Sequence, residues 1–113
     1  MSIWALVLAI AMALEGEAGS MGAPGMYVVA DSMLARQETG AAWPDVLTAY
    51  YGSAPPSAEA LAIAYAAVTV PWPSAGMPYC MSAGDVARIG LQVDRWYCNS
   101  GGCLGLAREW VRG

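Results

Sequence analysis

IWALVLAIAMAL, residues 3–14, is an unbroken apolar run around which we expect the rest of the chain to fold. A run of this length, rich in alanine and leucine, predicts a buried helix, and Ser2 before it is a suitable N-cap. Such a helix would span only about 18 Å, well short of the roughly 30 Å hydrocarbon core of a bilayer. We therefore expect a core helix and no membrane span.

Residues Glu15-Gly16-Glu17 end the apolar run. Gly16 predicts the helix stop, because glycine adopts the left-handed conformation at little cost. The two carboxylates then lie at the C-terminal end of a helix, where the peptide dipole disfavours negative charge. Residues that break such a local rule are often functional. Two solvated glutamates at a surface turn are the alternative, and these residues alone do not decide between the two interpretations.

The composition narrows the function classes. The net charge is −4, the chain has no lysine, and no basic stripe is visible, which argues against a nucleic-acid binder. The absence of histidine excludes Ser-His-Asp and Cys-His catalysis and histidine-ligated zinc. Acid–base chemistry would fall to carboxylates or tyrosines, and we expect no metal and no cofactor.

The remaining sequence predicts further helices joined by loops rich in proline and glycine. They are expected at residues 26–37, 44–51, 58–68, 83–89 and 104–111. Ser57 and Ser82 are the expected N-caps of the third and fourth, and Gly90 closes the fourth. Residues 91–97 alternate weakly and fit a short strand or an extended loop. With 113 residues, we expect one all-α domain covering residues 1–113, with room for a short extended or hairpin segment.

Three cysteines leave the disulfide pairing open. Cys98 and Cys103 flank Asn99-Ser-Gly-Gly102, a turn flexible enough to join them in an oxidising compartment. Cys80 could instead pair with either of them. Three thiols without histidine make a poor metal site, so the odd cysteine is expected to be buried as a small hydrophobe.

The order of the motifs resembles the cell wall hydrolase family typified by the spore cortex-lytic (SleB-like) enzymes, members of the lysozyme-like superfamily. The matching segments run in the same order over roughly residues 5–90: Gly16-Glu17-Ala18, Val28-Val29-Ala30, Ala35-Arg36, Trp43-Pro44-Asp45-Val46, Ala58–Tyr65 and Tyr79–Asp85. Two positions depart from the family pattern, Gly19 where an arginine is usual and Ala35 where an asparagine is usual. The Gln-aromatic-Ser segment expected after the third helix is missing near residues 50–53.

The resemblance implies a small lysozyme-like helical domain that cleaves the glycan strand of peptidoglycan without a cofactor, in the periplasm, the cell wall or a phage particle. It implies Glu17 as the catalytic acid and base, either of a lytic transglycosylase or of a muramidase-like hydrolase. Delivery of a proton to the glycosidic oxygen requires such a group. Glu15 is the rival, and Asp85 is more readily explained as part of the helix cap at Ser82.

Substrate contacts are expected from four residues near the predicted acid: Ser20, Tyr50, Tyr51 and Tyr79. The tyrosine faces could lie against sugar rings, although core packing with the hydroxyl at the surface is equally consistent with the sequence. Ser20 could hydrogen-bond near Glu17 or cap the next segment. Trp43 and Trp72 adjoin prolines at element boundaries and are expected in the core first.

Two other function classes remain open from the sequence. A chain this apolar could be a non-catalytic structural subunit of a phage particle or secretion assembly that keeps the fold without the chemistry. It could also be a membrane-associated helical protein held by residues 3–14. An open cleft at Glu17 would favour the enzyme.

Overall fold

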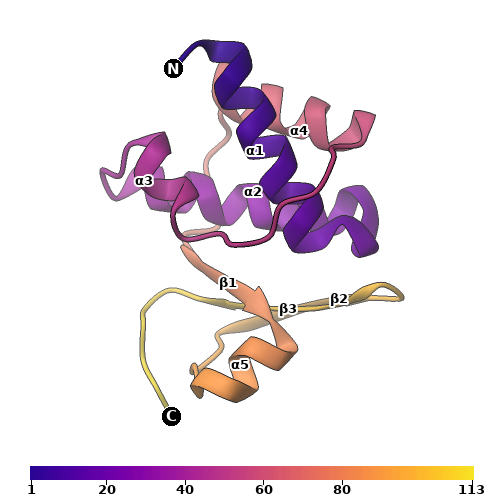
Figure 1. The fold of residues 1–113 in the computed structure, drawn as a ribbon. Coiled ribbons are helices and arrows are strands. Elements are labelled where there is room, and N and C mark those ends of the chain that lie inside the picture. The colour runs from indigo at the N-terminus through magenta and orange to yellow at the C-terminus, as the bar shows by residue number, and fades with distance from the viewer.

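Two layers make up the fold in the computed structural model, which describes residues 1–113 (Figure 1). The upper layer contains helices α1 to α4, and the lower layer contains a three-stranded sheet with helix α5. The elements are, in chain order, α1 Ile3–Ala18, the 3-10 turn η1 Gly19–Met21, α2 Gly22–Glu38, α3 Trp43–Leu47, α4 Ala58–Thr69, β1 Tyr79–Ser82, α5 Ala83–Ile89, β2 Arg95–Asn99 and β3 Gly102–Ala107.

Helix α1 lies against both α2 and α4, as its apolar sequence predicts. Ser2 caps it by accepting a hydrogen bond from the Ala5 N–H at 3.1 Å. Ile10 and Leu14 are completely buried. The outer face, however, is not covered: Trp4 is 67% exposed, and on the neighbouring α4 Tyr65 is 46% exposed. Residues 3–14 and 58–68, expected among the most buried segments, are therefore buried on their inner faces alone.

Gly16 does not end α1, contrary to the sequence prediction, because the helix continues to Ala18. Its role is close packing. A Cβ at this position would lie 2.1 Å from the backbone nitrogen of Ser53, and one on Gly52 would lie 2.6 Å from the carbonyl carbon of Gly16. Only glycine allows the two backbones to approach this closely.

Helix α2 begins at Gly22, four residues before the predicted start, and passes through Pro24 in its first turn. Its inner face buries Met26, Val29 and Met33. The helical run from Ile3 to Glu38 has a window long and apolar enough to cross a membrane by composition, a test that core helices also pass. The chain turns within that run at Gly22, whose φ is 71°.

The prediction of an all-α fold is wrong, because the C-terminal part of the chain forms an antiparallel sheet in the order β1-β3-β2. Residues 104–111, expected as a helix, form most of the central strand β3 and the tail behind it. A short apolar run cannot be assigned to helix or strand from periodicity alone. Here the segment is a strand because it pairs with β1 on one side and with β2 on the other. Leu106 lies opposite both Cys80 and Arg95. The alternation in residues 91–97 correctly indicated extended chain, although β2 itself covers Arg95–Asn99.

The three predicted N-caps and the predicted stop at Gly90 are all present. Ser57 caps α4 by accepting from the Ala60 N–H at 3.2 Å, as Ser2 caps α1. Ser82 accepts from the Asp85 N–H at 3.2 Å at the start of α5, and Gly90 ends that helix with a φ of 79°.

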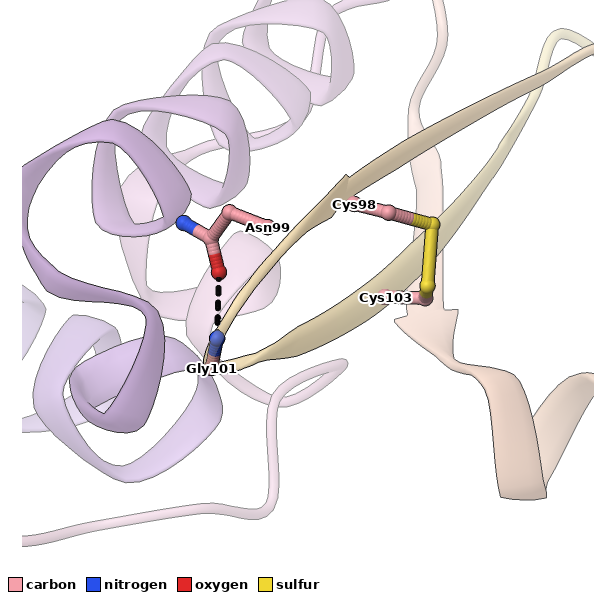
Figure 2. Close-up of a disulfide and its surroundings, with 4 residues drawn as sticks. All are labelled: Cys98, Asn99, Gly101 and Cys103. Carbon is pink, nitrogen blue, oxygen red and sulfur yellow. Dashed lines mark hydrogen bonds between the residues drawn. A yellow bond between two sulfur atoms is a disulfide. The ribbon is translucent and has the colours of Figure 1, made fainter.

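The β2–β3 hairpin connects the two layers. Its disulfide joins Cys98 to Cys103, which face each other in the register (Figure 2). Cys80 is the free thiol. The side-chain amide of Asn99 donates to the Met21 carbonyl oxygen at 2.9 Å, and its oxygen accepts from the Gly101 N–H at 2.8 Å. The tip of the hairpin is thereby held against η1, immediately after Glu17.

Candidate functional site

Glu17 lies in the last turn of α1 and is half-buried. The Gly52 N–H donates to its Oε1 at 2.8 Å, and no protein group donates to Oε2. The close packing of Gly16 on Gly52 places this N–H beside the carboxylate. One carboxylate oxygen is therefore held in place while the other is left to interact with a ligand.

A pocket of about 450 Å³ opens beside Glu17, between the helical layer and the sheet layer. This volume falls in the range that ligand sites usually occupy. Its walls come from several elements: Glu17, Arg36, Ala49, Tyr51, Gly52, Tyr79, Cys80, Met81, Asp85, Arg88, Ile89 and Trp110. The rings of Tyr79 and Trp110 lie 5.4 Å apart in a tilted arrangement, and Tyr51 is 92% exposed at the rim. The pocket thus combines the Glu17 carboxylate with aromatic surfaces that can lie against sugar rings.

Arg36, at the end of α2, also lines the pocket. Its guanidinium lies 5.1 Å from the centre of the Tyr79 ring and 5.6 Å from that of Tyr50. Its Nε is buried without a hydrogen-bond partner. No carboxylate lies within 4.0 Å of it, since the two ion pairs of the protein join Arg88 to Asp85 and Arg108 to Asp94.

The predicted substrate contacts separate into two groups. Tyr51 and Tyr79 line the pocket with Glu17. Tyr50 lies in the core, where it is 8% exposed and its hydroxyl is 2.7 Å from that of Ser32. Ser20 is exposed and donates to the Gly101 carbonyl oxygen at 3.2 Å, so it contacts the hairpin and not the pocket.

Burial raises the pKa of two titratable groups at the pocket, Cys80 in its wall and Tyr50 in the core. It raises the pKa of the Tyr50 hydroxyl to about 12, against the opposing effect of the Ser32 hydrogen bond. It also raises the pKa of the Cys80 thiol to about 12, and the nearby Glu17 carboxylate adds to that rise. Both groups are therefore neutral at physiological pH, and Cys80 is not an activated nucleophile.

Glu15 has a different role from Glu17. Its Oε1 accepts a hydrogen bond from the Ser57 N–H at 2.7 Å and ties α1 to the first turn of α4. Hydrogen bonding to Ser57 lowers the pKa of the Glu15 carboxyl, which keeps it ionised. Asp85 lines the far side of the pocket, but its Oδ1 is paired with Arg88 at 3.3 Å. Glu17 is thus the carboxylate of the pocket with no cationic partner.

The two departures from the family pattern lie outside the pocket. A Cβ at Gly19 would meet the Glu15 carboxylate at 2.3 Å, so a larger residue there would displace that side chain. Ala35 is 2% exposed and faces the core. Trp43 and Trp72 pack against the core, as predicted, and the Trp72 indole also donates to Asp31 at 2.8 Å.

Sequence reasoning missed three features of the site. Gly52, whose N–H holds the carboxylate, is one glycine of a predicted loop, and only the structure shows its close approach to Gly16. Arg36 was quoted as part of a motif but not as a pocket residue. Trp110 was placed in a helix, and nothing in the sequence placed its ring against Tyr79.

No family model, curated protein or solved structure matches the chain. The resemblance to cell wall hydrolases therefore stays a prediction from the motifs.

Proposed function

We propose that this protein cleaves the glycan strand of peptidoglycan, with Glu17 as the acid and base, and that it acts outside the cytoplasm. The observation that carries the proposal is the position of Glu17, half-buried in an aromatic-lined pocket with Oε2 free. The motif order described above supports the substrate class. The Cys98–Cys103 disulfide supports an oxidising compartment.

In the first step, protonated Glu17 donates its proton to the glycosidic oxygen as the bond to C1 breaks. The Gly52 N–H fixes Oε1, so the proton is carried by Oε2, which faces no protein donor. The negative charge left on Glu17 is then stabilised by the Gly52 N–H. The rings of Tyr79 and Trp110 offer surfaces against which the two sugars can stack.

In the second step, the Glu17 carboxylate takes a proton from the 6-hydroxyl of the same sugar while that oxygen attacks C1. The product is a 1,6-anhydro sugar, no water is consumed, and Glu17 returns to its protonated form. This lytic transglycosylation needs only one carboxylate, which agrees with the pairing of Asp85 to Arg88. Hydrolysis is the alternative outcome at the same site, with water in place of the 6-hydroxyl.

Incubation with purified peptidoglycan tests the proposal. Glu17→Gln keeps an oxygen that can accept from the Gly52 N–H but cannot transfer a proton. We expect cleavage to fall by at least about 10²- to 10⁴-fold while the melting temperature stays close to that of the wild type. Glu15→Gln is the matched control and should retain most of the activity.

Mass spectrometry of the products distinguishes the two reactions, because an anhydro end is lighter than a hydrolysed end by one water. An active Glu17→Gln variant together with an inactive Glu15→Gln variant would reverse the assignment of the two glutamates.

The second candidate function is a structural subunit of a phage particle or secretion assembly. The observation that favours it is an apolar groove of about 530 Å³ between α1 and α4, whose six lining residues are all hydrophobic. Wild-type protein that forms defined assemblies, yet cleaves no glycan under any condition of pH or redox state, would support this function.

A further inference from the structure

We infer that Arg36 binds a carboxylate carried by the ligand of the Glu17 pocket. That the ligand is a sugar strand rests on the proposed function. The carboxylate-binding site itself does not depend on that function.

Arg36 has no counter-ion within the protein. Arg36 is half-buried at the pocket wall, and its Nε–H is buried without a hydrogen-bond partner. A buried donor of a charged group that stays unsatisfied costs free energy. The other arginine of this pocket, Arg88, is paired with Asp85 at 3.3 Å. The buried Nε–H is itself out of a ligand's reach, but no protein carboxylate neutralises the guanidinium, so Arg36 is the cation of the pocket that a ligand carboxylate can neutralise.

The guanidinium of Arg36 is also held in place before a ligand binds. The rings of Tyr50 and Tyr79 lie 5.6 Å and 5.1 Å from the guanidinium and limit its movement. The Tyr50 hydroxyl is in turn fixed by Ser32 at 2.7 Å. A planar guanidinium held in one orientation matches the two oxygens of a carboxylate better than a flexible ammonium would.

Glu17 does not serve as this counter-ion within the protein. No oxygen of Glu17 lies within 4.0 Å of an Arg36 nitrogen, and the one hydrogen bond to the Glu17 carboxylate comes from Gly52. Both side chains nevertheless line the same pocket. A ligand that places a sugar oxygen at Glu17 can therefore place an acidic substituent at Arg36.

Peptidoglycan offers this chemistry from two sources. One is the lactyl carboxylate of a muramic acid whose stem peptide has been removed, and the other is a carboxylate of the peptide itself. Neutral sugars such as N-acetylglucosamine lack the group. The inference is thus that the pocket distinguishes acidic from neutral sugars through Arg36.

The test is an NMR titration of the full wild-type chain, following the Arg36 Nε–H resonance. This proton is buried and so protected from rapid exchange with water. The probes are N-acetylmuramic acid, its methyl ester, N-acetylglucosamine and an N-acetylmuramoyl dipeptide, in which the only carboxylate lies on the peptide. We expect the free acid to shift the resonance and the ester and N-acetylglucosamine to leave it in place. A shift by the dipeptide as large as that by the acid would show that the site also accepts a carboxylate of the stem peptide.

Arg36→Gln should weaken binding of N-acetylmuramic acid by at least about tenfold, to the level of its ester. Arg88→Gln, which removes a paired charge from the same pocket, should have a smaller effect. If the ester binds as tightly as the acid, or if Arg36→Gln binds the acid as the wild type does, the inference is wrong. The comparison of acid with ester uses the wild-type protein and holds even if Arg36→Gln does not fold.

The two proposals can fail separately. If the acid shifts the Arg36 resonance while the protein cleaves no glycan, the carboxylate site stands and the glycosidase proposal fails. If Glu17-dependent cleavage is found while acid and ester bind equally, the glycosidase proposal stands and the role of Arg36 is overturned. A change in the pH profile of cleavage alone would mean that Arg36 acts through Glu17, which also overturns the inference.

Discussion

Glu15 and Glu17 show how two like residues acquire different roles from their position on one helix. Two residues apart, they lie about 200° from each other around α1. Glu15 consequently faces the start of α4 and is tied to the Ser57 N–H, whereas Glu17 faces the pocket and the Gly52 N–H. The sequence shows both as acids at a helix end, and only the packing of Gly16 on the loop tells them apart.

The first prediction at this scale concerns acid stability. Because the Ser57 hydrogen bonds lower the pKa of Glu15 in the folded state, the ionised form stabilises the fold. That contribution is fully present above the ordinary glutamate pKa of 4.5 and is lost as the pH falls through the lower folded-state pKa. Glu15→Gln should therefore lower the free energy of unfolding at neutral pH and lose less of it on acidification. Urea titrations at several pH values would measure this, and parallel curves for the two proteins would contradict it.

At the scale of elements, the β2–β3 hairpin shows why the sequence predicted only part of the sheet. The turn Asn99-Ser-Gly-Gly102 and its flanking cysteines were recognisable, and the weak alternation before them indicated extended chain. The strand after the turn shows no alternation of apolar and polar residues, and the sequence therefore predicts a helix there. In the structure, Leu104 to Ala107 are all buried. Central strands covered on both faces give this pattern. The partner strand β1 gave no signal of its own over four residues.

The second prediction concerns the disulfide of this hairpin. In a Cys80→Ala background, which prevents exchange with the free thiol, reduction should lower the free energy of unfolding by about 2 kcal/mol, the entropy expected for so short a loop. The reduced hairpin should also hold η1 less firmly, because the Asn99 contact to Met21 depends on the strand geometry. Thermal melts with and without a thiol reductant would measure the effect.

Asn99→Ala is the matched variant for the hairpin, since it removes the bonds to Met21 and Gly101 while keeping the disulfide. If the two contacts are coupled, reduction of Asn99→Ala should cost less than reduction of the parent. Strict additivity would show that the disulfide and the docking of the hairpin tip are independent.

For the whole molecule, the sequence predicted the helical layer far better than the arrangement of the two layers. Five of the six predicted helices are present, three with the expected N-cap, because caps and periodicity are local signals. Which faces remain uncovered depends on the number of layers, and that is not a local property. The outer faces of α1 and α4, expected in the core, are exposed because no further layer covers them (Figure 1).

The third prediction follows from this exposure. The groove between α1 and α4 should bind a fluorescent apolar dye in the native protein, because its lining is entirely hydrophobic. The double variant Leu8→Gln and Leu61→Gln should reduce the dye signal and leave the melting temperature within a few degrees, as these side chains are 46% and 39% exposed. Trp96→Gln, at a 47% exposed position on β2, is the control and should leave the signal unchanged. Loss of cooperative melting in the double variant would mean that the groove belongs to the core.

The pocket takes Glu17 from near the start of the chain and Trp110 from near its end. During synthesis, the helices of the upper layer leave the ribosome first and can pack while the strands are still being made. The hairpin tip that holds η1 and the ring that faces Tyr79 are synthesised only after these helices. A nascent chain that ends after α4 therefore carries Glu17 without the sheet-layer wall of its pocket.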